Sequence, residues 1–127
     1  MKSRSTILIG LALIIVACSG EHATSTISAQ ELVTRINNNS APLVLDVRTI
    51  DEYNGGHIPG AINIPFDQFQ LEFDELKLAK KTEIVIYSET GYRSGKAEKD
   101  LKKQGYFEVR SLYGDIKRWR KLGFMLE

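Results

Sequence analysis

The sequence is poor in the residues that cross-link a protein or bind metal. Cysteine occurs once among 127 residues, at Cys18, and histidine occurs twice, at His22 and His57. A single cysteine cannot form an intramolecular disulfide, so the stability of the fold must come from packing. Since His22 lies in the expected N-terminal tether, and no cysteine or cluster of acids completes a site around His57, we expect no zinc site, no other metal and no cofactor.

An excess of charge of either sign is also lacking. Lysine and arginine number 17 against 16 aspartate and glutamate residues, which leaves a formal net charge of +1. Nothing in this balance suggests nucleic acid as a partner. The length fits one ordinary globular domain, and we find no internal repeat and no low-complexity segment.

The first residues of the sequence also lack an apolar run long enough to span a membrane. The apolar run at residues 7–17 is interrupted only by Gly10, whereas a helix needs roughly 20 apolar residues to span a bilayer. The run follows Lys2 and Arg4, which is typical of a signal peptide. It ends in Ile15-Val16-Ala17-Cys18, a sequence that resembles the bacterial lipobox, in which the cysteine is acylated and becomes the new N-terminus.

The first 26 residues therefore predict that the protein is exported and anchored to a membrane. We expect residues 1–17 to be a lipoprotein signal peptide and residues 18–26 an acylated tether, with membrane lipid bound through Cys18. The protein would then lie in the cell envelope on the periplasmic face, and Ser19 favours the outer membrane where the cell has two membranes. The alternative is an ordinary secretory peptide with an incidental cysteine.

Residues 27–127 predict a single domain of class α/β. Capping-box spacing at residues 28–31 indicates a helix that ends near Asn37. Short apolar runs at 43–45 and 84–87 are typical of strands buried on both faces of a parallel sheet. The remaining expected elements are helices within 65–76, 94–104 and 115–121 and a strand at 107–112. This alternation predicts three layers, α/β/α, around a mainly parallel sheet.

The last expected helix, with Asp115 as its cap, is strongly basic. Its cations are Lys117, Arg118, Arg120 and Lys121. They either form a solvated face while Ile116 and Trp119 point inward, or meet a membrane surface or an acidic partner. Amphipathic patterning favours the solvated face.

The first of two motifs begins at the end of the expected strand 43–45. It runs from Leu45-Asp46-Val47-Arg48 through Asp51-Glu52-Tyr53 to Gly56-His57-Ile58-Pro59-Gly60-Ala61-Ile62-Asn63-Ile64-Pro65. The motif resembles the N-terminal signature of the rhodanese family. Asp46 and Arg48 stand where charges pair or cap loops, and Gly60 belongs to a set of tight turns. We expect these residues to be scaffold rather than chemistry.

His57, within this motif, has two interpretations. A lone histidine beside a cleft suggests a general base. No cysteine or cluster of acids completes a triad or a metal site around it, and the family resemblance places it in a structural turn. We therefore expect a structural role for His57.

The second motif is Ser88-Glu89-Thr90-Gly91-Tyr92-Arg93-Ser94, between a strand and a helix. It resembles the rhodanese active-site loop, in which cysteine leads and glycine, arginine and serine follow at these spacings. A loop that enters a helix N-terminus turns backbone N–H groups toward one point and stabilises an anion there. In the family that anion is a cysteine thiolate and then its persulfide. The resemblance implies that Arg93 supplies positive charge or orients the loop.

Serine at residue 88 departs from the family pattern. Its oxygen cannot accept sulfane sulfur, and its hydroxyl needs a positioned base to become a nucleophile. The leading hypothesis is a membrane-anchored rhodanese-like domain that lacks sulfurtransferase activity and binds a small, thiosulfate-like anion or an envelope protein. The alternatives are an active sulfurtransferase in which Ser88 replaces a native cysteine, a serine hydrolase, and a purely structural scaffold.

Overall fold

Five short parallel strands form the sheet at the centre of the fold. The computed structural model describes residues 26–127, so the expected signal peptide, Cys18 and nearly all of the expected tether lie outside the described residues. The strands are β1 (Thr26–Ile27), β2 (Leu43–Asp46), β3 (Ile62–Asn63), β4 (Ile84–Tyr87) and β5 (Val109–Leu112). Their order is β1-β5-β4-β2-β3, and every pairing is parallel.

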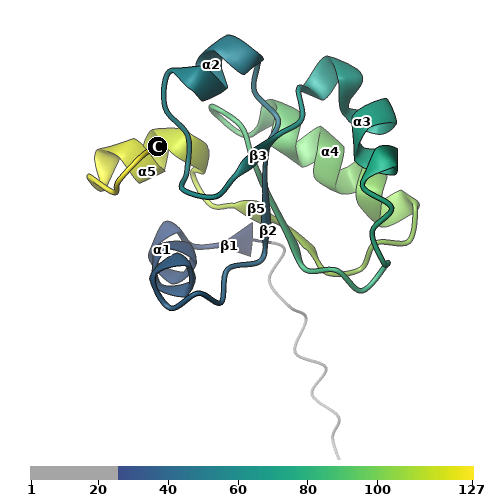
Figure 1. The fold of residues 1–127 in the computed structure, drawn as a ribbon, viewed down its shortest axis with the longest axis horizontal. Coiled ribbons are helices and arrows are strands. Elements are labelled where there is room, and N and C mark those ends of the chain that lie inside the picture. Colours follow the sequence, from purple (N-terminus) through teal and green to yellow (C-terminus); the bar gives the residue numbers. More distant parts are fainter. Residues whose placement is uncertain (1–25) are drawn as a thin grey trace, which may run out of the picture.

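Helices cover both faces of this sheet. They are α1 (Ala29–Asn37), α2 (Ile50–Asn54), the 3-10 turn η1 (Phe66–Gln68), α3 (Phe69–Glu75), α4 (Tyr92–Lys103) and α5 (Asp115–Lys121). Figure 1 shows α1 and α5 on one side of the strands and α3 and α4 on the other. The predicted three-layer α/β/α architecture is confirmed.

Two apolar cores lie between these layers. Under α1 and α5, Leu32 and Trp119 pack with Val85 of β4. Under α3 and α4, Phe73 and Leu101 pack with the other face of the sheet. All four residues of β4 are fully buried, which explains why its sequence is a continuous apolar run rather than an alternating one.

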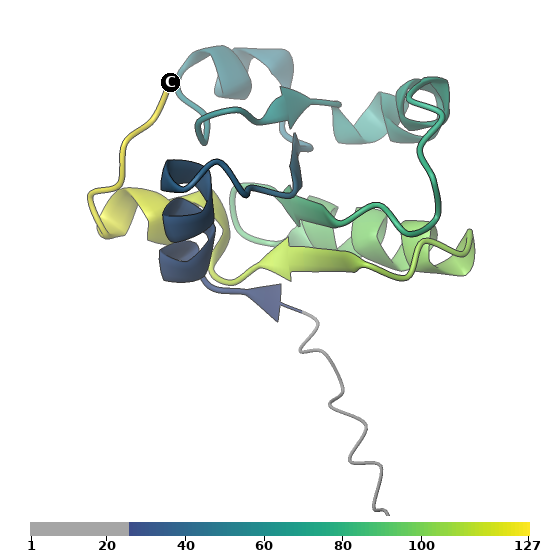
Figure 2. The same ribbon diagram turned by 60° about the horizontal axis from the view of Figure 1, so that its bottom comes forward.

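Several element boundaries differ from the sequence prediction. The sheet already includes Thr26, which pairs with Ser111 of β5. Figure 2 shows β1 beside β5 at the edge of the sheet. The helix expected within 65–76 is divided into η1 and α3, and α4 begins at Tyr92 rather than Ser94.

The expected cap of the last helix was wrong. Gly114 takes the N-cap position of α5, and Asp115 is its first helical residue, with a positive φ of 53°. The Asp115 side chain does not cap α5, because it accepts a hydrogen bond from the backbone of Ser88.

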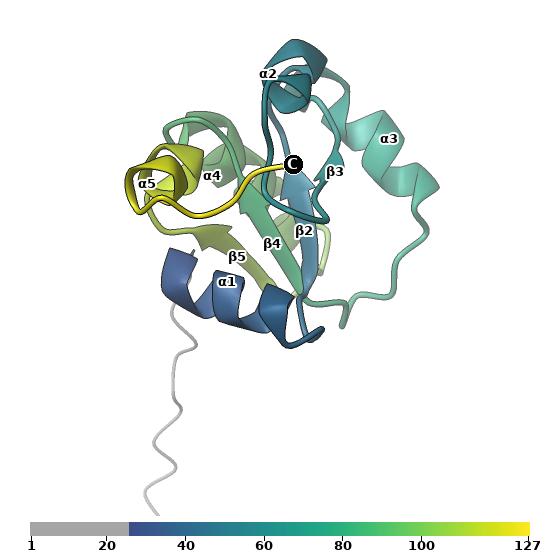
Figure 3. The same cartoon turned by 60° about the vertical axis from the view of Figure 1, so that its left-hand side comes forward.

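The carboxyl ends of the parallel strands meet at one edge of the sheet. In Figure 3 the arrowheads of β2 and β4 point toward α2, which lies across that edge. Binding sites of open parallel sheets form at this edge, because the loops after the strands gather there. Among residues 26–127, no helix is long and apolar enough to cross a membrane.

Candidate functional site

A tight loop connects β4 to α4 at the carboxyl edge of the sheet. Residues 88–91 separate the two elements, and Gly91 has a φ of 102°. A Cβ atom on Gly91 would lie 2.9 Å from Oδ2 of Asp115. Both the positive φ and the close approach require glycine here, because larger residues are strained in this region and would meet the carboxylate.

The hydroxyl of Ser88 lies where the loop N–H groups converge. Ser88 is 1% exposed. Its Oγ accepts hydrogen bonds from the N–H of Gly91 at 3.0 Å and of Ser94 at 3.4 Å, and donates to Oγ of Ser94 at 3.1 Å. The loop thus surrounds the Ser88 oxygen with donors, as the sequence motif predicts for the leading residue.

A buried carboxylate, which the sequence interpretation assigned to another role, completes this cluster. Oδ1 of Asp115 accepts hydrogen bonds from the N–H of Ser88 at 2.8 Å and from Oγ of Ser94 at 2.9 Å, and lies 3.4 Å from Oγ of Ser88. Burial raises the pKa of the Asp115 carboxyl, while the hydrogen bonds from Ser88 and Ser94 oppose that rise. The side chains of Ser88, Ser94 and Asp115 therefore form one buried, hydrogen-bonded cluster.

Four further N–H groups of the loop have no protein acceptor among the described residues. They belong to Glu89, Thr90, Tyr92 and Arg93. Because α4 is 12 residues long, its N-terminus adds the positive end of a helix dipole to these donors. These four donors are therefore not used within the described part of the chain.

Arg93 is held by a carboxylate of α2. Its guanidinium donates to both oxygens of Glu52, at 2.8 Å and 3.0 Å. The hydrogen bonds from Arg93 lower the pKa of Glu52 to about 2. Arg93 also lines a pocket of 280 Å³ together with Val47, Thr49, Pro65, Phe66 and Asp67. The arginine therefore joins α4 to α2 at the edge of a small pocket.

Asp46 and Arg48 form a buried network at the end of β2. Nη2 of Arg48 donates to Oδ2 of Asp46 at 2.7 Å and to the carbonyl of Gly56 at 2.8 Å. The hydroxyl of Tyr87 donates to the same Asp46 oxygen at 2.6 Å and accepts from the N–H of Ile58 at 3.1 Å. Burial raises the pKa of Tyr87 far above its usual range. This network fixes the loop after α2 to β2 and β4.

Glu89, in the loop between β4 and α4, lies close to the buried network of Asp46 and Arg48. Its Oε2 lies 3.7 Å from Nη1 of Arg48, and its Oε1 accepts from Arg120 of α5 at 2.6 Å. Glu89 thus points toward two cations rather than into the group of Ser88, Ser94 and Asp115.

His57 and Gly60 lie in the turn between α2 and β3. The His57 ring stacks on Tyr53 with centroids 3.7 Å apart, and its Nδ1 lies 3.0 Å from the Tyr53 carbonyl. The backbones of His57 and Glu127 exchange two hydrogen bonds of 2.9 Å, and the N–H of Gly60 donates to Oε2 of Glu127 at 3.1 Å. None of these contacts involves Ser88, which agrees with a structural role for His57.

Metal ligands do not gather in the part of the chain that the structure describes. Among residues 26–127, no group of three or more histidine, cysteine, aspartate or glutamate side chains is arranged to hold a metal ion. The polar groups around Ser88 are backbone N–H groups, two serine hydroxyls and the carboxyl of Asp115.

The geometry defines a class of protein: a parallel α/β domain whose strand-to-helix loop turns backbone N–H groups inward at the carboxyl edge of the sheet. Residues 28–122 match the rhodanese-like domain. The chain belongs to the rhodanese family, as the two sequence motifs predicted.

Relatives with similar sequences include proteins of sulfur metabolism. A sulfurtransferase of Allochromatium vinosum is 33% identical over 97 residues, which cover 76% of this chain and 89% of that protein. The putative sulfur carrier protein YrkF of Bacillus subtilis is 33% identical over 80% of this chain and 55% of its own length. The uncharacterized protein YqhL of B. subtilis is 38% identical over 60% of this chain and 59% of its own length. The chain thus spans less than two thirds of both Bacillus proteins.

Solved structures share the fold. A rhodanese-related protein of Thermoplasma volcanium superposes with a TM-score of 0.70 and 27% identity, covering 80% of this chain and 96% of that one. A thiosulfate sulfurtransferase of Pseudomonas aeruginosa gives a TM-score of 0.71 and 26% identity, over 80% of this chain and 20% of that one. The Thermoplasma structure consists almost entirely of the shared domain, so such a domain folds by itself in that protein.

Proposed function

We propose that this protein is a lipid-anchored rhodanese-like domain of the cell envelope that lacks sulfurtransferase activity and binds a small, thiosulfate-like oxyanion at residues 88–94. The observation that carries the proposal is the position of the Ser88 hydroxyl. It accepts hydrogen bonds from the N–H groups of Gly91 and Ser94, at the position where the family resemblance calls for a cysteine thiolate.

Oxygen chemistry excludes persulfide formation at this position. A persulfide needs a sulfur nucleophile that attacks sulfane sulfur, and Ser88 offers a neutral hydroxyl. The carboxyl of Asp115 lies 3.4 Å from that hydroxyl, but the same oxygen already accepts hydrogen bonds from Ser88 N–H and Ser94. The sequence contains no cysteine besides Cys18, whose sulfur is committed to lipid under the proposed processing.

The rest of the loop retains the donors that an oxyanion needs. The unpartnered N–H groups of residues 89, 90, 92 and 93 lie at the N-terminus of α4, and such clusters favour anions. Glu89 and Glu52 near this loop are both paired with arginines, which reduces their repulsion of an incoming anion. An oxyanion with three or four oxygen or sulfur acceptors matches this set of donors.

The activity test is the transfer of sulfur from thiosulfate to cyanide, and the thiocyanate formed is measured. We expect no turnover by the unaltered protein and persulfide formation by Ser88→Cys. The matched control is Ser40→Cys, which places a cysteine on an exposed loop. We expect the rate of persulfide formation to be roughly 100-fold higher in Ser88→Cys than in Ser40→Cys, because the loop donors converge on residue 88. Turnover by the unaltered protein would contradict the proposal of a silent domain.

Anion binding is tested by titrating the protein with thiosulfate, sulfate and phosphate while amide resonances are recorded. We expect shifts concentrated on the N–H groups of residues 89–93 and none at the start of α1. If no anion moves these resonances, the binding proposal is wrong.

The proposed anchor is tested separately in the intact bacterial cell. Cys18→Ser should abolish incorporation of labelled palmitate and release the domain from the membrane fraction. Retention of label after this substitution would refute acylation at Cys18.

A second candidate function is sulfur carriage or transfer, favoured by the names of the Allochromatium and Bacillus relatives. It applies if Ser88 replaces a native cysteine. Ser88→Cys then becomes the natural form, and its persulfide should pass to a thiol acceptor at a rate that Ser40→Cys does not reach.

A further inference from the structure

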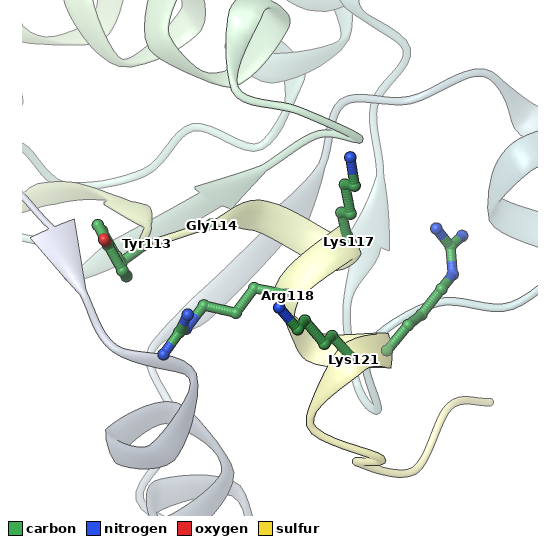
Figure 4. A pocket seen from close by; sticks show the side chains of 6 residues that line it. Tyr113, Gly114, Lys117, Arg118 and Lys121 are labelled. Carbon is green, nitrogen blue, oxygen red and sulfur yellow. The ribbon is translucent and has the colours of Figure 1, made fainter.

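A cluster of cations covers the outer side of α5. Four basic residues line a surface hollow of 660 Å³ with Tyr113 and Gly114 at one end, and we call this set the α5 basic surface. The basic residues are Lys117, Arg118, Arg120 and Lys121. Figure 4 shows Lys117, Arg118 and Lys121 projecting from the ribbon of α5, with Arg118 extending toward the side where Tyr113 lies.

Most of this charge is not neutralised within the domain. Arg120 forms an ion pair with Glu89 at 2.6 Å, and the Arg118 guanidinium lies 5.4 Å from the centre of the Tyr113 ring. Among residues 26–127, Lys117, Arg118 and Lys121 form no ion pair. The surface therefore presents three uncompensated cations to a partner.

Exposed apolar side chains precede and follow α5 in the chain. Tyr113, just before α5, is 58% exposed, while Leu122 and Met125, just after it, are 43% and 77% exposed. Cations beside exposed aromatic and aliphatic groups are typical of proteins that lie on a membrane, where the charges meet headgroups and the apolar groups enter the interface.

The chain enters the domain beside this surface. β1 pairs with β5 so that Ile27 lies opposite Leu112, and the N–H of Tyr113 donates to the Ile27 carbonyl at 2.8 Å. Only 26 − 18 = 8 residue steps separate Cys18 from Thr26, which reach at most roughly 30 Å when extended. A lipid on Cys18 would thus keep the α5 basic surface close to the bilayer.

We propose that the α5 basic surface binds anionic phospholipid headgroups and so docks the domain flat on the membrane that anchors it. The inference rests on the proposed lipid anchor for its biological setting, but the surface and its charges belong to the described domain. Attraction between a surface and anionic lipid extends over about one Debye length, about 8 Å in physiological salt. The tether keeps α5 within roughly 30 Å of the bilayer, and over the last 8 Å or so the charges of α5 add their own attraction.

The test uses residues 19–127 without lipid, because the described sheet and both cores lie within them and a related domain of similar extent folds alone. Binding is measured by cosedimentation with vesicles of equal parts phosphatidylglycerol and phosphatidylcholine, and with vesicles of phosphatidylcholine alone. We expect binding to the anionic vesicles only, and its loss as salt is raised.

A pair of variants assigns the binding to α5. Lys117→Gln with Lys121→Gln should weaken binding to anionic vesicles about 30-fold, the effect of removing two surface cations. The matched control is Lys99→Gln with Lys103→Gln, which removes two exposed lysines at the same spacing from α4 and should change binding less than about threefold. Equal losses in both variants, or no preference for phosphatidylglycerol, would overturn the proposal.

These outcomes are independent of the other proposals. The unlipidated domain carries no anchor, and neither lysine pair belongs to residues 88–94. A failure of vesicle binding therefore leaves the sulfur-transfer and palmitate results to be judged by themselves.

Discussion

The carboxyl of Asp115 is the ionisable group that hydrogen-bonds to Ser88. Its backbone has a positive φ of 53°, a conformation that aspartate and asparagine tolerate better than most residues. Its carboxyl is buried and accepts hydrogen bonds from Ser88 and Ser94, but among the described residues it forms no ion pair with a cation. Burial without a cation disfavours ionisation, which is why the pKa of Asp115 is raised.

Replacing Asp115 with asparagine should strengthen anion binding. The amide oxygen can still accept the hydrogen bonds from Ser88 and Ser94, and asparagine tolerates the positive φ, so the loop should keep its shape. We expect Asp115→Asn to bind thiosulfate on the order of tenfold more tightly at pH 7, because one nearby negative charge is removed. The measurement is titration calorimetry or the amide titration described above.

The pH dependence follows from the raised pKa of Asp115. A carboxyl whose pKa is raised by folding stabilises the protein at pH values below its unfolded pKa, and this stability is lost as pH rises through the folded pKa. Asp115→Asn should therefore be more stable than the unaltered protein at pH 7, and the difference should shrink as pH falls. Asp100→Asn, at an exposed position of α4, is the control. An equal effect at Asp100 would show that general charge, not Asp115, is responsible.

At the scale of elements, the candidate site is held by ties between short helices and the loops beside them. Arg93 of α4 binds Glu52 of α2, and Glu52 also accepts from the Thr49 N–H in a capping box. The α2 helix has only five residues, too few to be stable by itself. Its position over the sheet edge therefore depends on these side-chain bonds.

Glu52→Gln tests the tie between α2 and α4. Glutamine can keep the capping box, but the charge that pairs with Arg93 is lost. We expect a loss of about 1 kcal/mol in the free energy of unfolding at pH 7, since the pair is only partly buried and screened by solvent. Because Glu52 has a lowered pKa of about 2 against 4.5 ordinarily, its stabilising effect should be present above pH 4.5 and fade as pH falls toward 2.

Urea unfolding at pH 7 and near pH 3 measures this effect. The control is Glu75→Gln, at an exposed position of α3 where Glu75 forms no ion pair among the described residues. It should leave the free energy of unfolding nearly unchanged. A Glu52→Gln variant whose deficit is the same at both pH values would show that the ion pair is not its cause.

The elements that sequence predicted best are those with a strong local pattern. The apolar run of β4 and the capping-box spacing before α1 both indicated their elements correctly, and Ser28 is the N-cap of α1. By contrast, β1, α2 and β3 were not expected, because two to five residues carry no usable periodicity. Their existence depends on partners distant in sequence, such as Ser111 for Thr26.

The same reason limits what sequence could say of the candidate site. The motif at residues 88–94 is local, and its converging N–H groups follow from a strand-to-helix loop. Asp115 lies 27 residues from Ser88, so no spacing rule connects the two. The only local signal was an aspartate after Gly114, and it was interpreted as a helix cap.

At the scale of the whole molecule, the C-terminal segment ties α5 to the turn after α2. Glu127 exchanges two backbone hydrogen bonds with His57, and the carbonyl of Met125 accepts from the buried indole of Trp119 at 2.9 Å. Leu126 and Phe124 pack against the core under α1 and α5. The segment thus links the motif around His57 to the helix that carries the basic surface.

Removing residues 125–127 should destabilise the whole domain. The deletion removes two backbone hydrogen bonds, each contributing about 1 kcal/mol, together with the packing of Leu126, and it leaves the Trp119 indole without its acceptor. We expect a total loss of about 3 kcal/mol, which lowers Tm by roughly 10–20 °C in a domain of this size. Circular dichroism during heating measures the change. The control is Met125→Ser, which removes an exposed side chain but keeps the backbone and should lower Tm by no more than roughly 2 °C. If the deletion variant has the same Tm as this control, the C-terminal segment does not stabilise the fold.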